Sequence, residues 1–130
     1  MSESISTLPE LVGSSQFVRI PPELDVPLTA RVRAVLDTPA MQRLKEISQL
    51  GLVSLVYPGA IHSRFEHSLG VYRLALQVLK HLTQTHPDWA MTVEVSDVKV
   101  FLLAALLHDV GHWPYCHPIE DMRLRGSYSA

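Results

Sequence analysis

The clearest alternation of apolar and polar positions lies between Ser63 and Pro87. Apolar residues recur there at steps of four and three and so share one face of a helix: Phe65, Leu69, Tyr72, Leu76 and Leu79. A second, mostly apolar set lies almost opposite: His67, Val71, Leu74, Val78 and Leu82. Ser63 and Glu66 have the spacing of a capping box, so we expect the helix to begin after Ser63 and to end by Pro87. Because two of its sides are apolar, the pattern predicts a central, buried helix.

A second buried helix is predicted to begin between residues 93 and 97. It carries the longest purely apolar run of the chain, the eight residues from Val100 to Leu107, and it ends with His108 and Asp109. Two consecutive buried helices with a connection of medium length are usually antiparallel neighbours. We therefore expect this helix to pack alongside the first.

The pattern before residue 63 is weaker. Serine-rich residues 1–16 lack periodicity and predict a flexible tail. Residues 17–20 favour a short extended segment that ends at two prolines, and residues 53–57 are β-prone and precede a Pro-Gly turn. Residues 29–37 predict a short helix, and the Thr-Pro pair that follows starts another, which should stop near Gly51. The expected fold is all-α with at most minor strands: a tail at 1–16 and a partial domain at 17–130.

Composition narrows the class of protein. The chain of 130 residues is 47% apolar and 18% charged, which is typical of a globular domain. Its net charge of -2 gives no general electrostatic reason to bind nucleic acid or an anionic membrane. The eight-residue apolar run is far shorter than the roughly 20 residues that span a bilayer. A single cysteine, Cys116, and the absence of a secretory signal at the start favour a reducing, cytoplasmic setting.

Candidate chemistry follows from the predicted helix pair. His67 lies in the first turns of one helix, whereas His108 and Asp109 lie at the end of the other. Both helices rise roughly 23–24 Å, so in an antiparallel pair these three side chains can meet. Two imidazoles and a carboxylate suit iron, manganese or zinc, and three protein ligands leave positions open for water and substrate. Spacing alone leaves open that Asp109 is an exposed helix-end residue and His108 a core histidine.

Two segments carry a more specific resemblance. Residues 38–70 read TPAMQRLKEISQLGLVSLVYPGAIHSRFEHSLG, and residues 102–117 read LLAALLHDVGHWPYCH. They resemble the deoxynucleoside triphosphohydrolases of the HD superfamily, which show TPxFQRLRxIxQLG, PGAxHxRFEHSLGV and LLHDxGHxPFSH in this order. The similarity covers roughly residues 17–121, and several linked motifs make it specific.

The resemblance implies a metal-dependent phosphohydrolase. It implies that His67, His108 and Asp109 are metal ligands, with an aspartate much further along the chain as the fourth. Asp121 comes too soon to match that ligand. The implied reaction is hydrolysis of a nucleotide, such as a deoxynucleoside triphosphate, or a related phosphate ester by metal-activated water, and Mg²⁺ could accompany the substrate. With the distal aspartate missing, we expect a truncated domain whose exposed apolar helices favour a homo-oligomer.

The resemblance also implies substrate contacts and catalytic groups. Arg64 matches an arginine that contacts the substrate phosphate, and Gln49 matches a glutamine at the sugar. His112 and His117 match histidines beside the phosphates, one of which could act as a general acid or orient water. Glu120 stands where relatives often carry an aspartate that supports this histidine.

Each of these residues could also have a purely structural role. Arg64 could be a surface residue of the first helical turn, Gln49 a helix-end residue, and His117 and Glu120 plain loop residues. As a whole, the chain could be a non-catalytic HD remnant or a regulatory module. A zinc-protease motif at His108 and His112 is disfavoured, since Gly111 breaks the helix between them. An iron oxygenase is disfavoured because such sites usually lie on a β-barrel.

Overall fold

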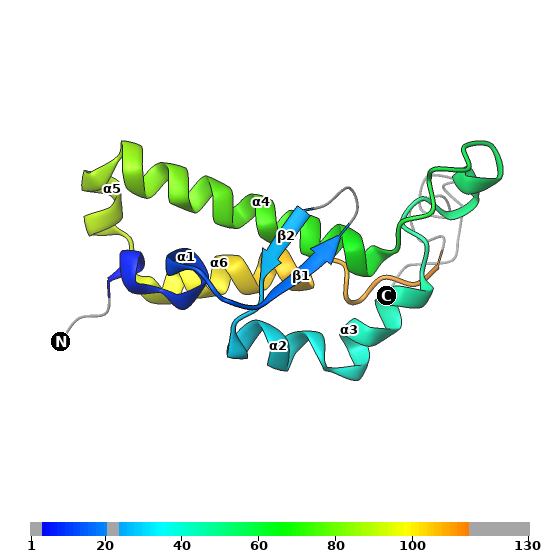
Figure 1. Ribbon diagram of the computed structural model, residues 1–130, viewed down its shortest axis with the longest axis horizontal. Helices are drawn as coiled ribbons and strands as arrows, with labels where there is room; N and C mark the ends of the chain where they lie inside the picture. Colours follow the sequence, from blue (N-terminus) through cyan, green and yellow to red (C-terminus); the bar gives the residue numbers. More distant parts are fainter. Residues whose placement is uncertain (1–3, 21–23, 115–130) are drawn as a thin grey trace, which may run out of the picture.

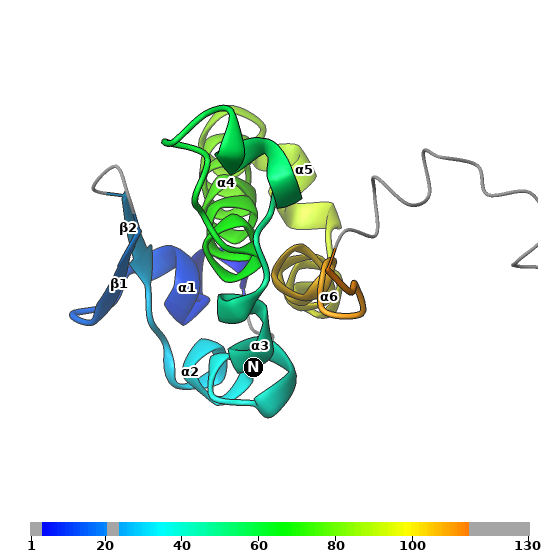
Figure 2. The ribbon, with the colours of Figure 1, turned by 90° about the vertical axis from the view of Figure 1, so that its right-hand side faces the viewer.

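The computed structural model describes residues 4–20 and 24–114. Two antiparallel helices form its frame: α4 (Arg64–Thr85) and α6 (Val95–Leu107), connected by the short α5 (Pro87–Thr92) (Figure 1). This confirms both predicted helices and their arrangement. The prediction that the second helix is buried is wrong for one side of α6, because Val100, Phe101 and Leu103 are exposed in the described part of the protein. Ser63 caps α4, and His86 follows its last residue, immediately before Pro87. The earlier helices α1 (Pro9–Val12), α2 (Ala30–Leu36) and α3 (Pro39–Arg43) lie on one side of the pair (Figure 2).

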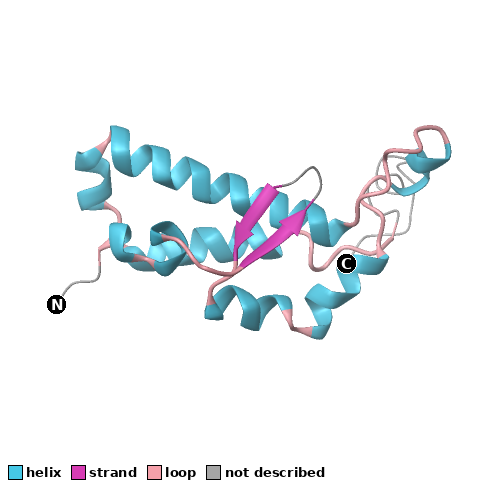
Figure 3. Cartoon of the chain, viewed as in Figure 1, coloured by secondary structure: helices cyan, strands magenta, loops and turns pink. Residues whose placement is uncertain are grey.

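The fold is mostly helical, as predicted, with one small sheet (Figure 3). Strand β1 (Phe17–Ile20) pairs antiparallel with β2 (Leu24–Pro27), in a register that sets Phe17 opposite Pro27. The extended segment at residues 17–20 was predicted, whereas its partner strand was not. Among the described residues, no helix is both long and apolar enough to cross a membrane.

Thr29 and Thr38 start α2 and α3 as the sequence predicts. Each threonine side chain accepts a hydrogen bond from the backbone N–H three residues later. The helix from Thr38 is shorter than expected, because a 3-10 turn (Leu44–Glu46) ends it and Ile47 is extended. The carbonyl oxygen of Ile47 accepts from the backbone N–H of Arg64 at 2.8 Å, so this segment pairs with the entry to α4 instead of continuing a helix.

The prediction of a β-prone segment at residues 53–57 is wrong. A 3-10 helix (Gly51–Leu55) occupies this region, and the backbone N–H of Val56 donates to the carbonyl oxygen of Val53 at 3.0 Å. Leu55 is 79% exposed and Val56 is 71% exposed. Strand preference reflects packing on a half-buried sheet surface, and these side chains have no such surface to pack on.

The described residues of the expected tail, 4–16, pack against the rest of the fold. A 3-10 turn (Ile5–Thr7) and α1 place Ile5 and Leu8 in the hydrophobic core. Glu10 of α1 is also buried. This differs from the flexible tail that we expected, because two apolar residues are enough to anchor a segment that shows no periodicity.

The core lies on one face of α4. Leu69, Tyr72, Leu76 and Leu79 of the first predicted face are buried. On the second face Leu74 is 59% exposed and Val78 is 45% exposed, so the prediction of burial on two sides is wrong for the part of the chain that is described. The physical reason is that the described elements pack against one side of α4.

Candidate metal centre

The start of α4 is fixed by the predicted capping box. The backbone N–H of Glu66 donates to Ser63 Oγ at 3.3 Å, and Glu66 Oε2 accepts from the backbone N–H of Ser63 at 2.6 Å. These reciprocal bonds satisfy two donors that a helix N-terminus otherwise leaves unpaired. Arg64 and His67 therefore project from a rigid first turn.

The end of α6 supplies the opposite wall of the site. After Leu107 the chain turns tightly: the backbone N–H of Val110 donates to the carbonyl oxygen of Leu107 at 2.9 Å, and that of His112 to Asp109 at 3.1 Å. Because α4 and α6 run antiparallel, this turn lies beside the first turn of α4 (Figure 1). The sequence argument for bringing the two helix ends together is thus confirmed.

Three side chains converge between the helix ends. His67, His108 and Asp109 each offer a ligand atom, and these atoms lie within 4.8 Å of one another. The Nε2 atoms of the two histidines are 3.3 Å apart, and Nε2 of His108 is 3.4 Å from Oδ1 of Asp109. Zinc–nitrogen bonds of 2.0–2.1 Å in a tetrahedron would separate two ligating nitrogens by about 3.3–3.4 Å. The donor set therefore fits a divalent cation.

The tautomer of His108 also suits a metal ligand. Nδ1 of His108 lies 3.0 Å from the carbonyl oxygen of Ala105, which can only accept a hydrogen bond. The proton of a neutral ring therefore sits on Nδ1, and Nε2 keeps its lone pair toward His67 and Asp109. Such an outer hydrogen bond is the usual way in which proteins orient a ligating imidazole.

Arg64 occupies the buried side of the site. Its side chain is 1% exposed, and Nη1 donates to Oδ2 of Asp109 at 2.9 Å. Nδ1 of His112 lies 2.9 Å from Oδ1 of Asp109 and 3.2 Å from Nη1 of Arg64. Since arginine can only donate, Nδ1 of His112 either donates to Asp109 or accepts from Arg64. Asp109 is therefore held from two directions, and the interpretation of Arg64 as a surface residue is wrong.

The electrostatics keep these groups in the charge states that a metal requires. Burial lowers the pKa of His67, and the neighbouring His108 lowers it further, although Asp109 acts in the opposite direction. Burial alone would raise the pKa of Asp109, but its electrostatic interactions with His108 and Arg64 and its hydrogen bond with His112 outweigh burial and lower the pKa. Near neutral pH the site thus holds a neutral His67 and an ionised Asp109.

Gln49 lies next to this cluster in the fold. Its backbone N–H donates to the carbonyl oxygen of His62 at 3.1 Å, in a bridge that sets Ser48 opposite Ser63. The side-chain oxygen Oε1 is buried and has no hydrogen-bond partner in the described part of the protein. An acceptor left in this state is suited to receive a donor from a ligand. The two remaining predicted residues, His117 and Glu120, lie outside the described residues.

Sequence reasoning missed one residue that shapes the site. Nη2 of Arg43, at the end of α3, donates to the carbonyl oxygens of Val110 and His112 at 2.9 and 2.8 Å. Arg43 thereby holds the turn that carries Asp109. Its only signal in the sequence is its place in the stretch TPAMQRL, where nothing indicates a contact almost 70 positions away.

Comparisons with known proteins agree with this geometry. The HD domain family model matches residues 64–128, half of the chain. A putative HD domain-containing protein of Acanthamoeba polyphaga mimivirus is 36% identical over 75% of this chain and 23% of its own length. The deoxynucleoside triphosphate triphosphohydrolase SAMHD1 of Danio rerio is 45% identical over 67% of this chain and 14% of its own length.

Solved structures show the same likeness. The crystal structure of a phosphohydrolase from Bacteroides thetaiotaomicron aligns with a TM-score of 0.72 and 34% identity, over 86% of this chain and 27% of that one. A hypothetical protein from Aquifex aeolicus aligns with a TM-score of 0.66 and 34% identity, over 82% of this chain and 26% of that one. The chain therefore spans 14–27% of the length of these relatives. The family model matches half of the chain, and the motifs lie on the helix pair described above. The chain therefore belongs to the HD-domain family.

Proposed function

We propose that this chain carries the metal-binding part of a phosphohydrolase that acts on a nucleotide or a related phosphate ester. The observation that carries the proposal is the convergence of two imidazole nitrogens, 3.3 Å apart, with a buried carboxylate at the end of α6. A carboxylate at a helix C-terminus faces the negative end of the helix dipole, which is unfavourable unless a cation is nearby. A bound iron, manganese or zinc ion would polarise a phosphoryl oxygen and lower the pKa of water.

The protein groups around the three ligands support phosphate chemistry. Arg64 places a guanidinium within 2.9 Å of Asp109, so a phosphate close to the ligand cluster would lie next to a fixed positive charge. His108 is 36% exposed and His112 is 33% exposed, which gives solvent and substrate access from this side. In this proposal Arg64 neutralises phosphate charge, and any Mg²⁺ that accompanies a nucleotide adds to that neutralisation.

His112 is the candidate general acid. When its Nδ1–H donates to Oδ1 of Asp109, at 2.9 Å, the opposite nitrogen Nε2 is left to exchange protons with substrate or to orient water. Relatives whose names state an activity include deoxynucleoside triphosphate triphosphohydrolases, which favours a deoxynucleoside triphosphate as the first substrate to test. In the proposed complex Gln49 binds the sugar through its buried Oε1.

The test is a hydrolysis assay with the purified chain. Deoxynucleoside triphosphates, ribonucleoside triphosphates and p-nitrophenyl phosphate are incubated with the chain and Mn²⁺, Fe²⁺ or Zn²⁺, with and without Mg²⁺. We expect release of phosphate or triphosphate, and its loss in His108→Ala. His81→Ala is the matched control, since His81 is an exposed residue of the same helix pair. A His108→Ala variant with full turnover would contradict the assignment, and metal binding without turnover on any substrate would contradict the proposed activity.

A further inference from the structure

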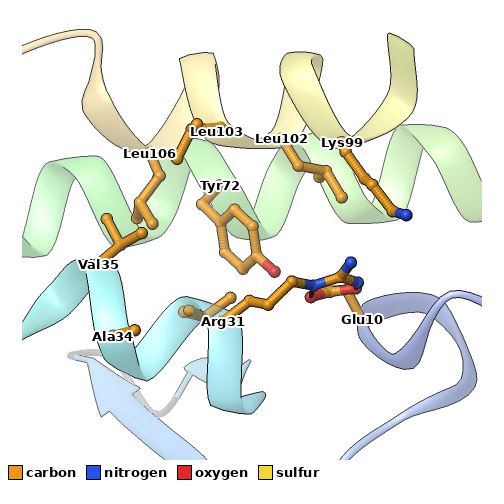
Figure 4. A pocket seen from close by; sticks show the side chains of 10 residues that line it. Glu10, Arg31, Ala34, Val35, Tyr72, Lys99, Leu102, Leu103 and Leu106 are labelled. Atoms are coloured by element: carbon orange, nitrogen blue, oxygen red, sulfur yellow. Dashed lines mark hydrogen bonds and ion pairs between the residues drawn. The ribbon is translucent and has the colours of Figure 1, made fainter. Parts of the chain in front are cut away.

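A cavity lies away from the three candidate ligands. It has a volume of about 370 Å³ and opens between α2, α4 and α6 (Figure 4). Its wall is mostly apolar and includes Val32, Val35, Leu102, Leu103 and Leu106. Cavities of about 300–1,000 Å³ with apolar walls and a few polar groups are typical of small-molecule sites. None of the residues that line this one belongs to the metal cluster.

The polar groups of the cavity gather at one end. Glu10, Arg31 and Lys99 lie together there, whereas Leu106 and Val35 lie at the other end (Figure 4). Arg31 Nη2 donates to Oε2 of Glu10 at 2.7 Å, and Thr29 Oγ1 donates to Oε1 at 2.9 Å. Burial would raise the pKa of Glu10, but these hydrogen bonds outweigh it and lower the pKa, so Glu10 is ionised. Two cationic side chains, Arg31 and Lys99, therefore line this end of the cavity beside the ionised Glu10.

Tyr72 supplies a hydroxyl that the described residues do not satisfy. The residue is 1% exposed, and its ring forms part of the cavity wall. The hydroxyl points toward the Arg31–Glu10 end (Figure 4), yet it has no hydrogen-bond partner among residues 4–20 and 24–114. Burial raises the pKa of Tyr72 well above its usual range, so the group stays protonated and can donate. A buried hydroxyl without a partner is unfavourable, and a ligand acceptor would remove that cost.

We propose that this cavity binds a small monocarboxylate with an aliphatic or aromatic body. Its carboxylate accepts from the Tyr72 hydroxyl and lies near the cationic side chains of Arg31 and Lys99. Its apolar body packs against the leucine and valine side chains of α2 and α6. Arg31 is 48% exposed and Leu103 is 44% exposed, so a ligand can enter between these helices.

The experiment is calorimetric titration of the purified chain with octanoate. The chain-length-matched probes 1-octanol and octylamine test which head group the site selects. We expect octanoate to bind most tightly and octylamine least. Tyr72→Phe should weaken octanoate binding about tenfold, the loss of roughly one hydrogen bond. Tyr57→Phe is the matched control because Tyr57 is 66% exposed and outside the cavity, and it should bind like the unmodified chain.

A second readout separates binding from folding. Removal of a hydroxyl that has no partner should leave the melting temperature of the ligand-free chain unchanged or raise it, while the stabilisation by octanoate is reduced. Leu103→Trp, which fills the cavity without touching the polar end, should abolish octanoate binding in a folded protein. Absence of octanoate binding at millimolar concentration would overturn the proposal. So would equal affinity for octanoate in Tyr72→Phe, or tighter binding of 1-octanol or octylamine.

Discussion

Replacement of Arg64 by methionine would test the charge balance of the metal centre. The change removes the guanidinium but keeps most of the apolar stem. The two side chains of the Arg64–Asp109 pair are only 1% and 5% exposed. Removal of one partner from such a buried pair typically costs about 3–5 kcal/mol. Because Asp109 keeps His112 as a partner at 2.9 Å, we expect the lower end, about 3 kcal/mol.

Urea unfolding of the metal-free chain, followed by circular dichroism, measures this loss. The same substitution in an Asp109→Asn background should cost much less, because the uncompensated carboxylate is then absent. Saturating Zn²⁺ or Mn²⁺ should also reduce the loss in Arg64→Met, since a bound cation replaces the missing counter-charge. A loss below about 0.5 kcal/mol, or the same loss in both backgrounds, would refute the reasoning.

The lowered pKa of Asp109 predicts how the stabilisation by the Arg64–Asp109 pair changes with pH. The folded state binds this proton less readily than the unfolded state, whose carboxyl pKa is about 3.9. The contribution of the pair to stability is therefore complete above that pH and is lost as the pH falls through the lowered value. The difference between the unmodified chain and Arg64→Met should accordingly shrink in strong acid.

Three further predictions concern packing, the turn and proton binding. Leu69→Ala, at a site with 0% exposure, should lower the free energy of unfolding in urea by about 2–5 kcal/mol. Leu74→Ala, at 59% exposure, should change it by no more than about 0.5 kcal/mol. Equal losses would contradict a core on one face of α4. Arg43→Ala should weaken metal binding severalfold in a calorimetric titration, because the turn that carries Asp109 loses two hydrogen bonds, and unchanged affinity would contradict that positioning role. The ring protons of His67 should titrate, by NMR, below the usual histidine pKa of about 6.5, and a midpoint at or above it would contradict the effect of burial.

Local signals made the site-bearing helices predictable. The capping box at Ser63 and Glu66 sets the start of α4, and the apolar run before His108 sets the end of α6. Antiparallel packing of consecutive helices then brings their ends together without knowledge of the remaining chain. Periodicity along the sequence thus predicted that His67, His108 and Asp109 can meet, whereas their interpretation as metal ligands needed the resemblance to the HD superfamily.

Features that depend on distant partners were not predictable. The spacing of Arg64 in the first turn of α4 is typical of a surface residue, and only the arrival of Asp109 from 45 positions away explains its burial. Burial of Glu10 likewise depends on Arg31 and Thr29 across 21 and 19 positions. Leu55, in a β-prone segment, is exposed in a 3-10 helix because no neighbouring strand is there to pair with it in the described structure. Periodicity reports which face of an element is apolar, but not which element covers it.

Metal content of the purified chain is the measurement that tests the central claim most directly. Mass spectrometry of the unmodified protein should find close to one equivalent of a divalent transition metal. Asp109→Ala should lose it, while Asp97→Ala, at an exposed acid of α6, should retain it, with circular dichroism confirming that both variants are folded. Absence of metal from the unmodified chain after incubation with Mn²⁺, Fe²⁺ and Zn²⁺, or full retention in folded Asp109→Ala, would contradict the account.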